Sequence, residues 1–387
     1  MRPSPAALAA VALLAAAGAA GAQPRDSAAF LVRIGTDTTV VERYVRDGSR
    51  IVMEAVQRSP STVLHRMVMT LGAGDRVTEA EWTATPPGAA QPGTRRVVRF
   101  RGDSAVVATT QGGGTREVRV AAAAAIPMAG PFYAPYELAI MRAVAGGRPK
   151  TEVVLLPAAA TVTIPIERVG RDSVALENQF GEPMRAHVDA RGRLLHLHTP
   201  AFTTVERLPW IDLDAFARDF AERDATGRGL GMLSPRATTR TMLGGANLWL
   251  DYSRPAMRGR PVWGRLVPYG ELWRLGANDA THLATDRPLD LGGLALAPGT
   301  YTLFLLPAAD AWTLVVNRGT GISGLERDST LDVGRVPMRL ETLSSPAEQL
   351  TIEAAPAQGG PAQGGEAAGT LSIAWDRTRG SVPIRVR

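Results

Sequence analysis

The stretch DYSRPAMRGRPVWGRLVPYGELWRLGANDATHLATD, residues Asp251–Asp286, decides the fold of the C-terminal part of the chain. It contains five arginines and two tryptophans, and it follows an alternating strand at Ala246–Tyr252. Pro255 disfavours continuation of that strand within a sheet. The segment is therefore expected to be a long irregular connection between strands, serving either as a packing signature of the fold or as the lining of a site.

The strands that follow this segment predict a β-sandwich. Tyr301–Leu306 is apolar on both faces, and a turn at Pro307–Asp310 joins it to Trp312–Asn317 as a hairpin. Near the C-terminus, Leu371–Trp375 and Val382–Val386 alternate between apolar and polar residues, as half-exposed strands do. Residues 234–387 are thus expected to form a jelly-roll-like β-sandwich domain.

Several motifs in this region occur together in one known family. The segments DYSRP…RGR, VWGRLVPYG, WRLGANDAT and APGTYTLFLLP, with the strand AWTLVVNR, resemble a family of bacterial extracytoplasmic domains of unknown function, over about residues 234–387. Family members tend to carry Gln-Trp-Gly where this chain has Ile322-Ser323-Gly324. The resemblance implies no enzyme activity and no catalytic residue.

Residues 23–208 are expected to form an N-terminal antiparallel β meander with one helix, at Pro135–Ala145. Short period-two runs separated by turn residues favour this arrangement, because parallel strands need long crossovers. The clearest runs are Thr39–Tyr44, Ser49–Val56, Val63–Leu71, Arg95–Phe100, Glu117–Val120, Glu152–Leu156, Thr161–Arg168 and Ser173–Glu177. The fold class is therefore mainly β, with two antiparallel β domains.

A change of period marks a helical linker at residues 209–233. Asp212 is an N-cap residue, and Leu213, Phe216 and Phe220 fall on one face of the helix that follows it. Charged residues of both signs occupy the other face, so the helix is expected to dock on a domain rather than on a membrane.

The N-terminus has the pattern of a signal peptide. In Met1–Ala22, Arg2 precedes the apolar run Ala6–Ala17, and Ala20-Gly21-Ala22 is a cleavage site of small residues. A periplasmic or extracellular protein without a transmembrane segment after cleavage is expected. The chain has no cysteine, so it has no disulfide framework and no thiol nucleophile.

The net charge of +6 is not a sign of nucleic-acid binding. Lys150 is the one lysine among 43 basic residues, and the arginines are scattered among 37 acidic residues. Phosphate-backbone binding favours basic residues gathered on one face or arm. No nucleic-acid partner is expected; the expected partner is a small molecule or an envelope component.

His196-Leu197-His198 is the metal candidate, because residues two apart on a strand point to the same side. A zinc site needs a third protein ligand. A two-residue turn pairs His187 with Leu194 and places all three histidines on one face. A three-residue loop with Gly192 in the left-handed conformation pairs His187 with Leu195 and places it on the other face. Because Gly192 favours the second register, no metal site and no cofactor are expected.

No known catalytic motif occurs in the sequence, so a non-enzymatic binding module is the preferred interpretation. The polar groups of the opening segment are the candidate ligand site, since arginine binds carboxylate or phosphate through two parallel hydrogen bonds. The candidate residues are Arg254, Arg260, Arg274, Asn278, Asp279 and His282. These arginines are equally suited to a scaffold role, binding loop carbonyls while the tryptophans fill the edge of the core.

Two alternative functions come from other classes. One is a metal-independent hydrolase in which His282 acts as base with Asp279 or Asp251. The other is a periplasmic carrier whose N-terminal sheet holds an apolar ligand on a concave face lined by residues such as Val63, Met67 and Met69.

Overall fold

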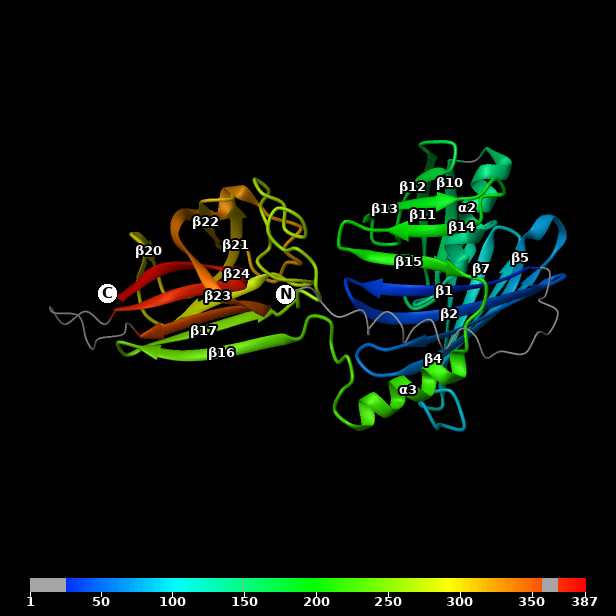
Figure 1. Cartoon of the computed structure of the whole chain (residues 1–387), viewed down its shortest axis with the longest axis horizontal. Coiled ribbons are helices and arrows are strands. Elements are labelled where there is room, and N and C mark those ends of the chain that lie inside the picture. Colours follow the sequence, from blue (N-terminus) through cyan, green and yellow to red (C-terminus); the bar gives the residue numbers. More distant parts are fainter. Residues whose placement is uncertain (1–25, 148, 357–367) are drawn as a thin grey trace. The chain divides into compact units, whose positions relative to one another are not determined.

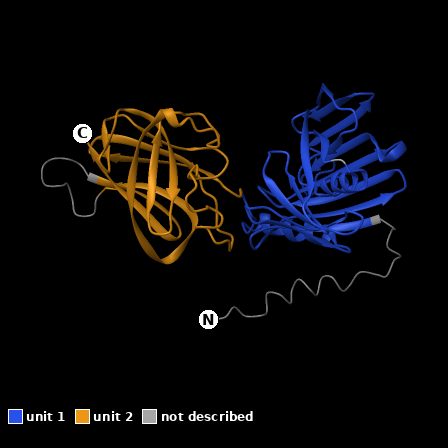
Figure 2. Cartoon of the chain, turned by 90° about the horizontal axis from the view of Figure 1, so that it is seen from above, with its two compact units in different colours: residues 1–231 blue, residues 232–387 orange. Residues whose placement is uncertain are grey.

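The computed structural model describes residues 26–147, 149–356 and 368–387. The chain divides into two compact units, Met1–Gly231 and Met232–Arg387 (Figure 2). The predicted signal peptide, Met1–Ala22, lies outside the described residues. Both units are mainly β, as the sequence predicts.

The N-terminal unit is built on one sheet of fifteen described strands, in the order β8-β7-β6-β5-β4-β3-β2-β1-β15-β14-β13-β12-β11-β10-β9 (Figure 1). The strands are β1 Asp26–Ile34, β2 Asp37–Asp47, β3 Arg50–Gln57, β4 Val63–Leu71, β5 Val77–Thr85, β6 Thr94–Arg101, β7 Ser104–Gln111, β8 Gly114–Ala121, β9 Ile126–Met128, β10 Lys150–Leu155, β11 Ala160–Arg168, β12 Ser173–Glu177, β13 Pro183–Val188, β14 Leu194–His198 and β15 Thr203–Leu208. The pairing of β1 with β15 joins the two ends of the meander.

One pair of strands departs from the predicted antiparallel pattern. β9 and β10 are parallel, and α2 (Ala134–Gly146) lies in the connection between them. A parallel pair requires such a crossover, which is usually helical. The helix predicted at Pro135–Ala145 is therefore confirmed, and its role is to carry the chain from β9 to β10.

The two faces of the sheet are covered by different helices. Phe30 and Val32 of β1 belong to the large core that contains α2, whereas Leu31 belongs to a smaller core with α3 (Leu213–Ala225). Alternate residues of a strand point to opposite faces, so α2 covers the concave face and α3 the other (Figure 1). Asp212 caps α3 as predicted, accepting a hydrogen bond from Ala215 N at 3.0 Å.

The sheet curves enough to bring β8, at one edge, next to β11, which lies near the other edge. The Thr161 hydroxyl, on β11, donates a hydrogen bond of 2.7 Å to the carbonyl oxygen of Ala121 at the end of β8. α2 lies within this curve, and its buried residues Ala139 and Ile140 are 0% exposed.

The C-terminal unit has nine described strands, in the order β16-β17-β18-β21-β22-β23-β24-β19-β20. They are β16 Arg236–Leu243, β17 Ala246–Ser253, β18 Thr281–Thr285, β19 Leu289–Leu291, β20 Leu294–Leu296, β21 Gly299–Pro307, β22 Trp312–Asn317, β23 Asp332–Pro356 and β24 Ala368–Val386.

The long strand β23 makes this sheet a sandwich. Its first residues pair with β22, and the rest, from Arg339, pair with β24, with register shifts at Ala347. The core between the layers contains Leu303 and Leu314 from one side and Ile373 and Ile384 from the other. The predicted hairpin is confirmed as β21–β22, and the two predicted C-terminal strands are parts of β24. Among the described residues, no helix combines the length and apolar character needed to span a membrane.

Candidate functional site

The three candidate arginines of the opening segment bind backbone carbonyls of their own unit. Arg254 Nε donates to Leu350 O at 3.3 Å, and Arg260 Nη2 donates to Ala256 O at 2.5 Å. Arg274 Nη1 donates to Asn278 O at 2.7 Å and to Ser323 O at 3.3 Å. Each guanidinium therefore holds a different backbone segment in place by hydrogen bonds. This is the scaffold role that the sequence analysis gave as the alternative to ligand binding.

The other candidates lie near the β17–β18 pair. His282 pairs with Asp251 across the two strands, but Asp251 is bound by Arg236, with Nη2 2.7 Å from Oδ2. Burial lowers the pKa of His282, and the positive charge of Arg236 lowers it further, by a smaller amount. Its Nε2 is buried and has no hydrogen-bond partner among the described residues. Asn278 has a left-handed backbone conformation (φ 64°), and both Asn278 and Asp279 are exposed. An Asp251 held by Arg236 is not free to orient His282, so this geometry does not favour the hydrolase.

The tryptophans of the segment pack together, as predicted for the edge of a core. Trp263 lies with its ring centroid 4.2 Å from that of Trp312, and Trp273 stacks on Trp375 at 5.7 Å. Trp263 Nε1 also donates to Trp375 O at 3.1 Å. Five cavities of the described residues, all in the N-terminal unit, have no lining residue from this segment. The ligand-binding role of the six candidate residues stays a prediction.

The histidine register differs from the one expected. Gly192 is left-handed (φ 81°), but His187 pairs with His196, and Val188 pairs with Leu194. Leu195 is thus the extra residue of a β-bulge, which shifts the register and puts His187 on the same face as His196 and His198. The expectation that His187 lies on the other face is wrong. Even so, no group of three or more His, Cys, Asp or Glu among the described residues is placed to hold a metal.

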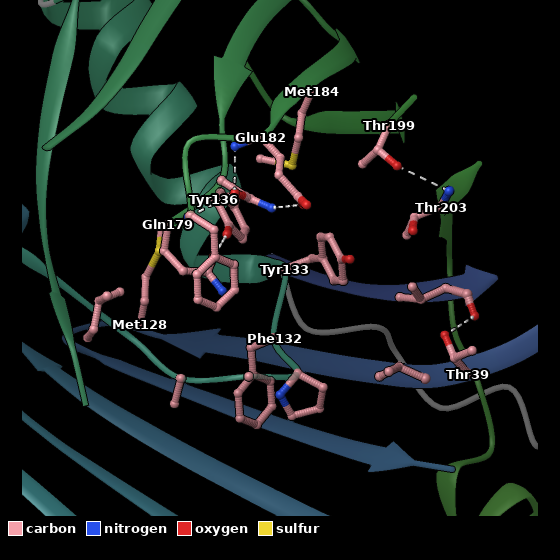
Figure 3. A pocket seen from close by; sticks show the side chains of 18 of the residues that line it. Thr39, Met128, Phe132, Tyr133, Tyr136, Gln179, Glu182, Met184, Thr199 and Thr203 are labelled. Carbon is pink, nitrogen blue, oxygen red and sulfur yellow. Dashed lines mark hydrogen bonds between the residues drawn. The ribbon is translucent and has the colours of Figure 1, made fainter. Parts of the chain in front are cut away.

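A cavity in the N-terminal unit has the character of a ligand site (Figure 3). Its volume is about 370 Å³, within the range of small-molecule pockets. We call it the Tyr133 cavity; it is lined by Val32, Ile34, Thr39, Val40, Met128, Ala129, Gly130, Pro131, Phe132, Tyr133, Tyr136, Leu155, Pro157, Ala158, Asn178, Gln179, Phe180, Glu182, Met184, Thr199, Ala201 and Thr203. Most of these side chains are apolar or aromatic. Among the described lining residues, Glu182 is the one with an acidic or basic side chain of the Asp, Glu, Lys, Arg or His type.

The polar groups of the Tyr133 cavity come from α2, from the loop between β12 and β13, and from Thr39, Thr199 and Thr203 (Figure 3). The Tyr136 hydroxyl donates a hydrogen bond to the Gln179 side chain, linking α2 to the loop between β12 and β13. Asn178 organises this loop: its Oδ1 accepts from Phe180 N at 2.9 Å, and its Nδ2 donates to Glu182 Oε2 at 2.8 Å. Phe180 itself is 78% exposed at the rim of the cavity. A ligand would thus meet a mostly apolar lining, with polar groups from this loop and from the three threonines.

Glu42 fixes the segment that carries Tyr133. Its carboxylate is 0% exposed, and it accepts hydrogen bonds from Tyr133 N at 2.6 Å and Ala134 N at 3.0 Å, where α2 begins. These N–H groups have no partner within the helix, so a side chain from β2 satisfies them. Burial raises the pKa of Glu42 to about 8, against the lowering effect of the two hydrogen bonds.

A second buried carboxylate holds the next turn of α2. Glu137 Oε2 accepts hydrogen bonds from Leu194 N at 2.7 Å and from Arg207 Nη1 at 2.5 Å, and its Oε1 accepts one from the Tyr44 hydroxyl. Burial raises the pKa of Glu137, while the charge of Arg207 opposes that shift. Together, Glu42 and Glu137 fix the orientation of the helix that forms one wall of the Tyr133 cavity.

The Tyr133 cavity lies at a different place from the concave face expected around Val63, Met67 and Met69. Met67 and Met69 are 0% and 1% exposed and belong to the core, so they form no exposed concave face. The expected lining is wrong because α2 and its preceding segment fill that part of the curve. The sequence signal that was overlooked is Phe132-Tyr133-Ala134-Pro135-Tyr136, three aromatic residues within five positions of a chain that is 5% aromatic.

The comparison with protein families confirms the resemblance seen in the motifs. Residues 234–384 match a family described as "Protein of unknown function (DUF2911)", and the N-terminal region has no family match. Curated proteins give no match to the chain.

Among solved structures, the chain is similar at 10% identity to the isotype 1 transferrin binding protein B from serogroup B Neisseria meningitidis. That match covers 91% of this chain and 66% of the other, just under two thirds of its length, with a TM-score of 0.13. A similarity at this TM-score supports no conclusion about fold or function.

Proposed function

We propose that this chain is an extracytoplasmic, non-enzymatic ligand-binding protein whose N-terminal unit holds an apolar molecule in the Tyr133 cavity. The observation that carries the proposal is the cavity itself, about 370 Å³ in volume and lined mostly by apolar and aromatic residues. Ligand pockets typically combine such a lining with a few placed polar groups. The extracytoplasmic location rests on the signal-peptide pattern of Met1–Ala22.

The charge of the lining narrows the class of ligand. Among the described residues, no Lys, Arg or His lines the Tyr133 cavity, so a buried carboxylate or phosphate would find no cationic partner among them. Burying an unpaired charge costs several kcal/mol. The supported ligand is therefore uncharged where it is buried, with any hydrogen-bonding group directed toward Gln179, Glu182 and the Tyr136 hydroxyl.

The test uses N-phenyl-1-naphthylamine, a neutral apolar fluorophore whose emission rises in an apolar site. We expect saturable binding to the wild-type protein, weakened by roughly tenfold or more in Ala158→Trp, because the added indole occupies space at the cavity wall. Ala158 is exposed, on the turn between β10 and β11, so the change should be compatible with folding.

The matched control is Ala90→Trp, the same substitution at an exposed loop position outside the cavity. It should bind the fluorophore as the wild type does. Equal affinities for Ala158→Trp and Ala90→Trp, with both variants folded by circular dichroism, would rule out the Tyr133 cavity as the binding site.

A further inference from the structure

A second cavity of the N-terminal unit, of about 820 Å³, lies beside the C-terminal half of α2 and shares no lining residue with the Tyr133 cavity. It is formed by that helix, the short turn η1 (Ala73–Asp75), residues 123–124 and the start of β10. We call it the Lys150 cavity, and its charged lining residues are Arg46, Asp75, Arg76, Arg142, Lys150 and Glu152.

The arginines of the Lys150 cavity are held in place by contacts with neighbouring segments of the same unit. Arg46 Nη2 lies 2.8 Å from Asp75 Oδ1, and Arg142 Nη2 donates to Asp75 O at 2.5 Å. Arg76 Nη2 donates to Ala123 O at 2.6 Å. A guanidinium has five N–H donors, so a single bond of this kind positions Arg76 and leaves most of its donors for a ligand.

The lining carries an excess of positive charge. The lining contains four cationic side chains and two carboxylates. Of the carboxylates, Asp75 forms an ion pair with Arg46, and Glu152 accepts a hydrogen bond from Ala123 N at 3.2 Å. Lys150 is the one lysine of the chain, and within the described residues its ammonium group has no hydrogen-bond partner. The charged side chains of the lining therefore sum to a net charge of +2.

Helix electrostatics do not explain this arrangement. The favourable interaction of a cation with the helix dipole is limited to the last turn, and the last turn of α2 has no basic residue. Arg46 comes from β2, and Arg76 follows η1. The basic side chains of the lining thus reach one cavity from separate elements.

We propose that the Lys150 cavity binds a phosphate-class oxyanion, with Lys150 as a mobile point charge and Arg76 as a planar donor. A phosphate group offers several acceptor oxygens and up to two negative charges, matching both the donors and the charge excess. The phosphate can belong to a soluble molecule or to a lipid headgroup. This site is separate from the proposed apolar site, and either can fail without the other.

Calorimetric titration of the full protein with inorganic pyrophosphate at low ionic strength tests the proposal. We expect saturable binding that weakens by about tenfold in Lys150→Gln and in Arg76→Gln, since each removes a charged donor. Arg116→Gln, an exposed position on β8 outside the cavity, lowers the net charge equally and should leave the affinity unchanged. If Lys150→Gln and Arg116→Gln bind alike, or if the wild type shows no saturable binding, the proposal is wrong.

A second experiment distinguishes the two sources of phosphate. If a lipid headgroup is the ligand, the wild type sediments with phosphatidylglycerol vesicles, pyrophosphate competes, and Lys150→Gln loses more binding than Arg116→Gln. If the ligand is soluble, pyrophosphate binds at the cavity and the vesicles do not distinguish the two variants. Vesicle binding that Lys150→Gln and Arg116→Gln reduce equally, together with no saturable pyrophosphate binding, reflects net charge alone and contradicts the site.

Discussion

Replacing Arg207 with methionine is expected to destabilise the N-terminal unit by about 3–5 kcal/mol, because it leaves Glu137 buried without its cationic partner. The Glu137 side chain is 3% exposed, and the Arg207 guanidinium, itself 15% exposed, donates to it at 2.5 Å. The remaining donors, Leu194 N and the Tyr44 hydroxyl, provide hydrogen bonds but no charge. The measurement is chemical denaturation, with hydrogen exchange of α2 peptides showing that the loss lies in this unit.

The double variant Arg207→Met with Glu137→Gln provides the control. If the loss comes from the unpaired charge rather than from the missing arginine stem, removing the charge should restore much of the stability. Arg33→Met removes the arginine of a more exposed ion pair with Glu206, where we expect less than about 1 kcal/mol. A single Arg207→Met variant as stable as Arg33→Met would contradict the role assigned to the pair.

Local patterns predicted the elements whose cause is local. The strand at β21 that is apolar on both faces, the alternation within β24, the N-cap at Asp212 and the helix at α2 all depend on residues close in sequence, and each is confirmed. The resemblance of the C-terminal region rests on motifs in a fixed order, and the family match to residues 234–384 confirms it.

Features that depend on long-range packing were not predictable in the same way. The bulge at Leu195 changes one register by one residue, and this moves His187 to the other face of the sheet. The Tyr133 cavity combines residues from β1, β2, the segment before α2 and three later loops, so no single stretch of sequence reveals it. The density of arginines in Asp251–Asp286 suggested a ligand site, but Arg254, Arg260 and Arg274 bind carbonyls of their own unit.

Glu42 is expected to make the stability of the N-terminal unit fall as the pH rises from about 4.5 to about 8. Burial raises its pKa from 4.5 to about 8 in the folded chain, so the folded state binds the proton more tightly than the unfolded state. The stability from this proton is fully present below pH 4.5 and is lost as the pH passes through 8. The shift corresponds to a loss of up to about 5 kcal/mol.

The variant Glu42→Gln isolates this effect, because glutamine keeps the shape of the side chain but has no carboxyl proton to lose. It should cost roughly 1–3 kcal/mol at low pH, since its amide can accept from only one of the N–H groups of Tyr133 and Ala134. The difference between wild type and variant should then shrink, and can reverse, as the pH approaches 8. The measurement is urea denaturation across this range, with Glu117→Gln on exposed β8 as the control for the substitution itself. A difference that is constant with pH would show that Glu42 is ionised throughout, with the hydrogen bonds at the start of α2 outweighing the cost of burial.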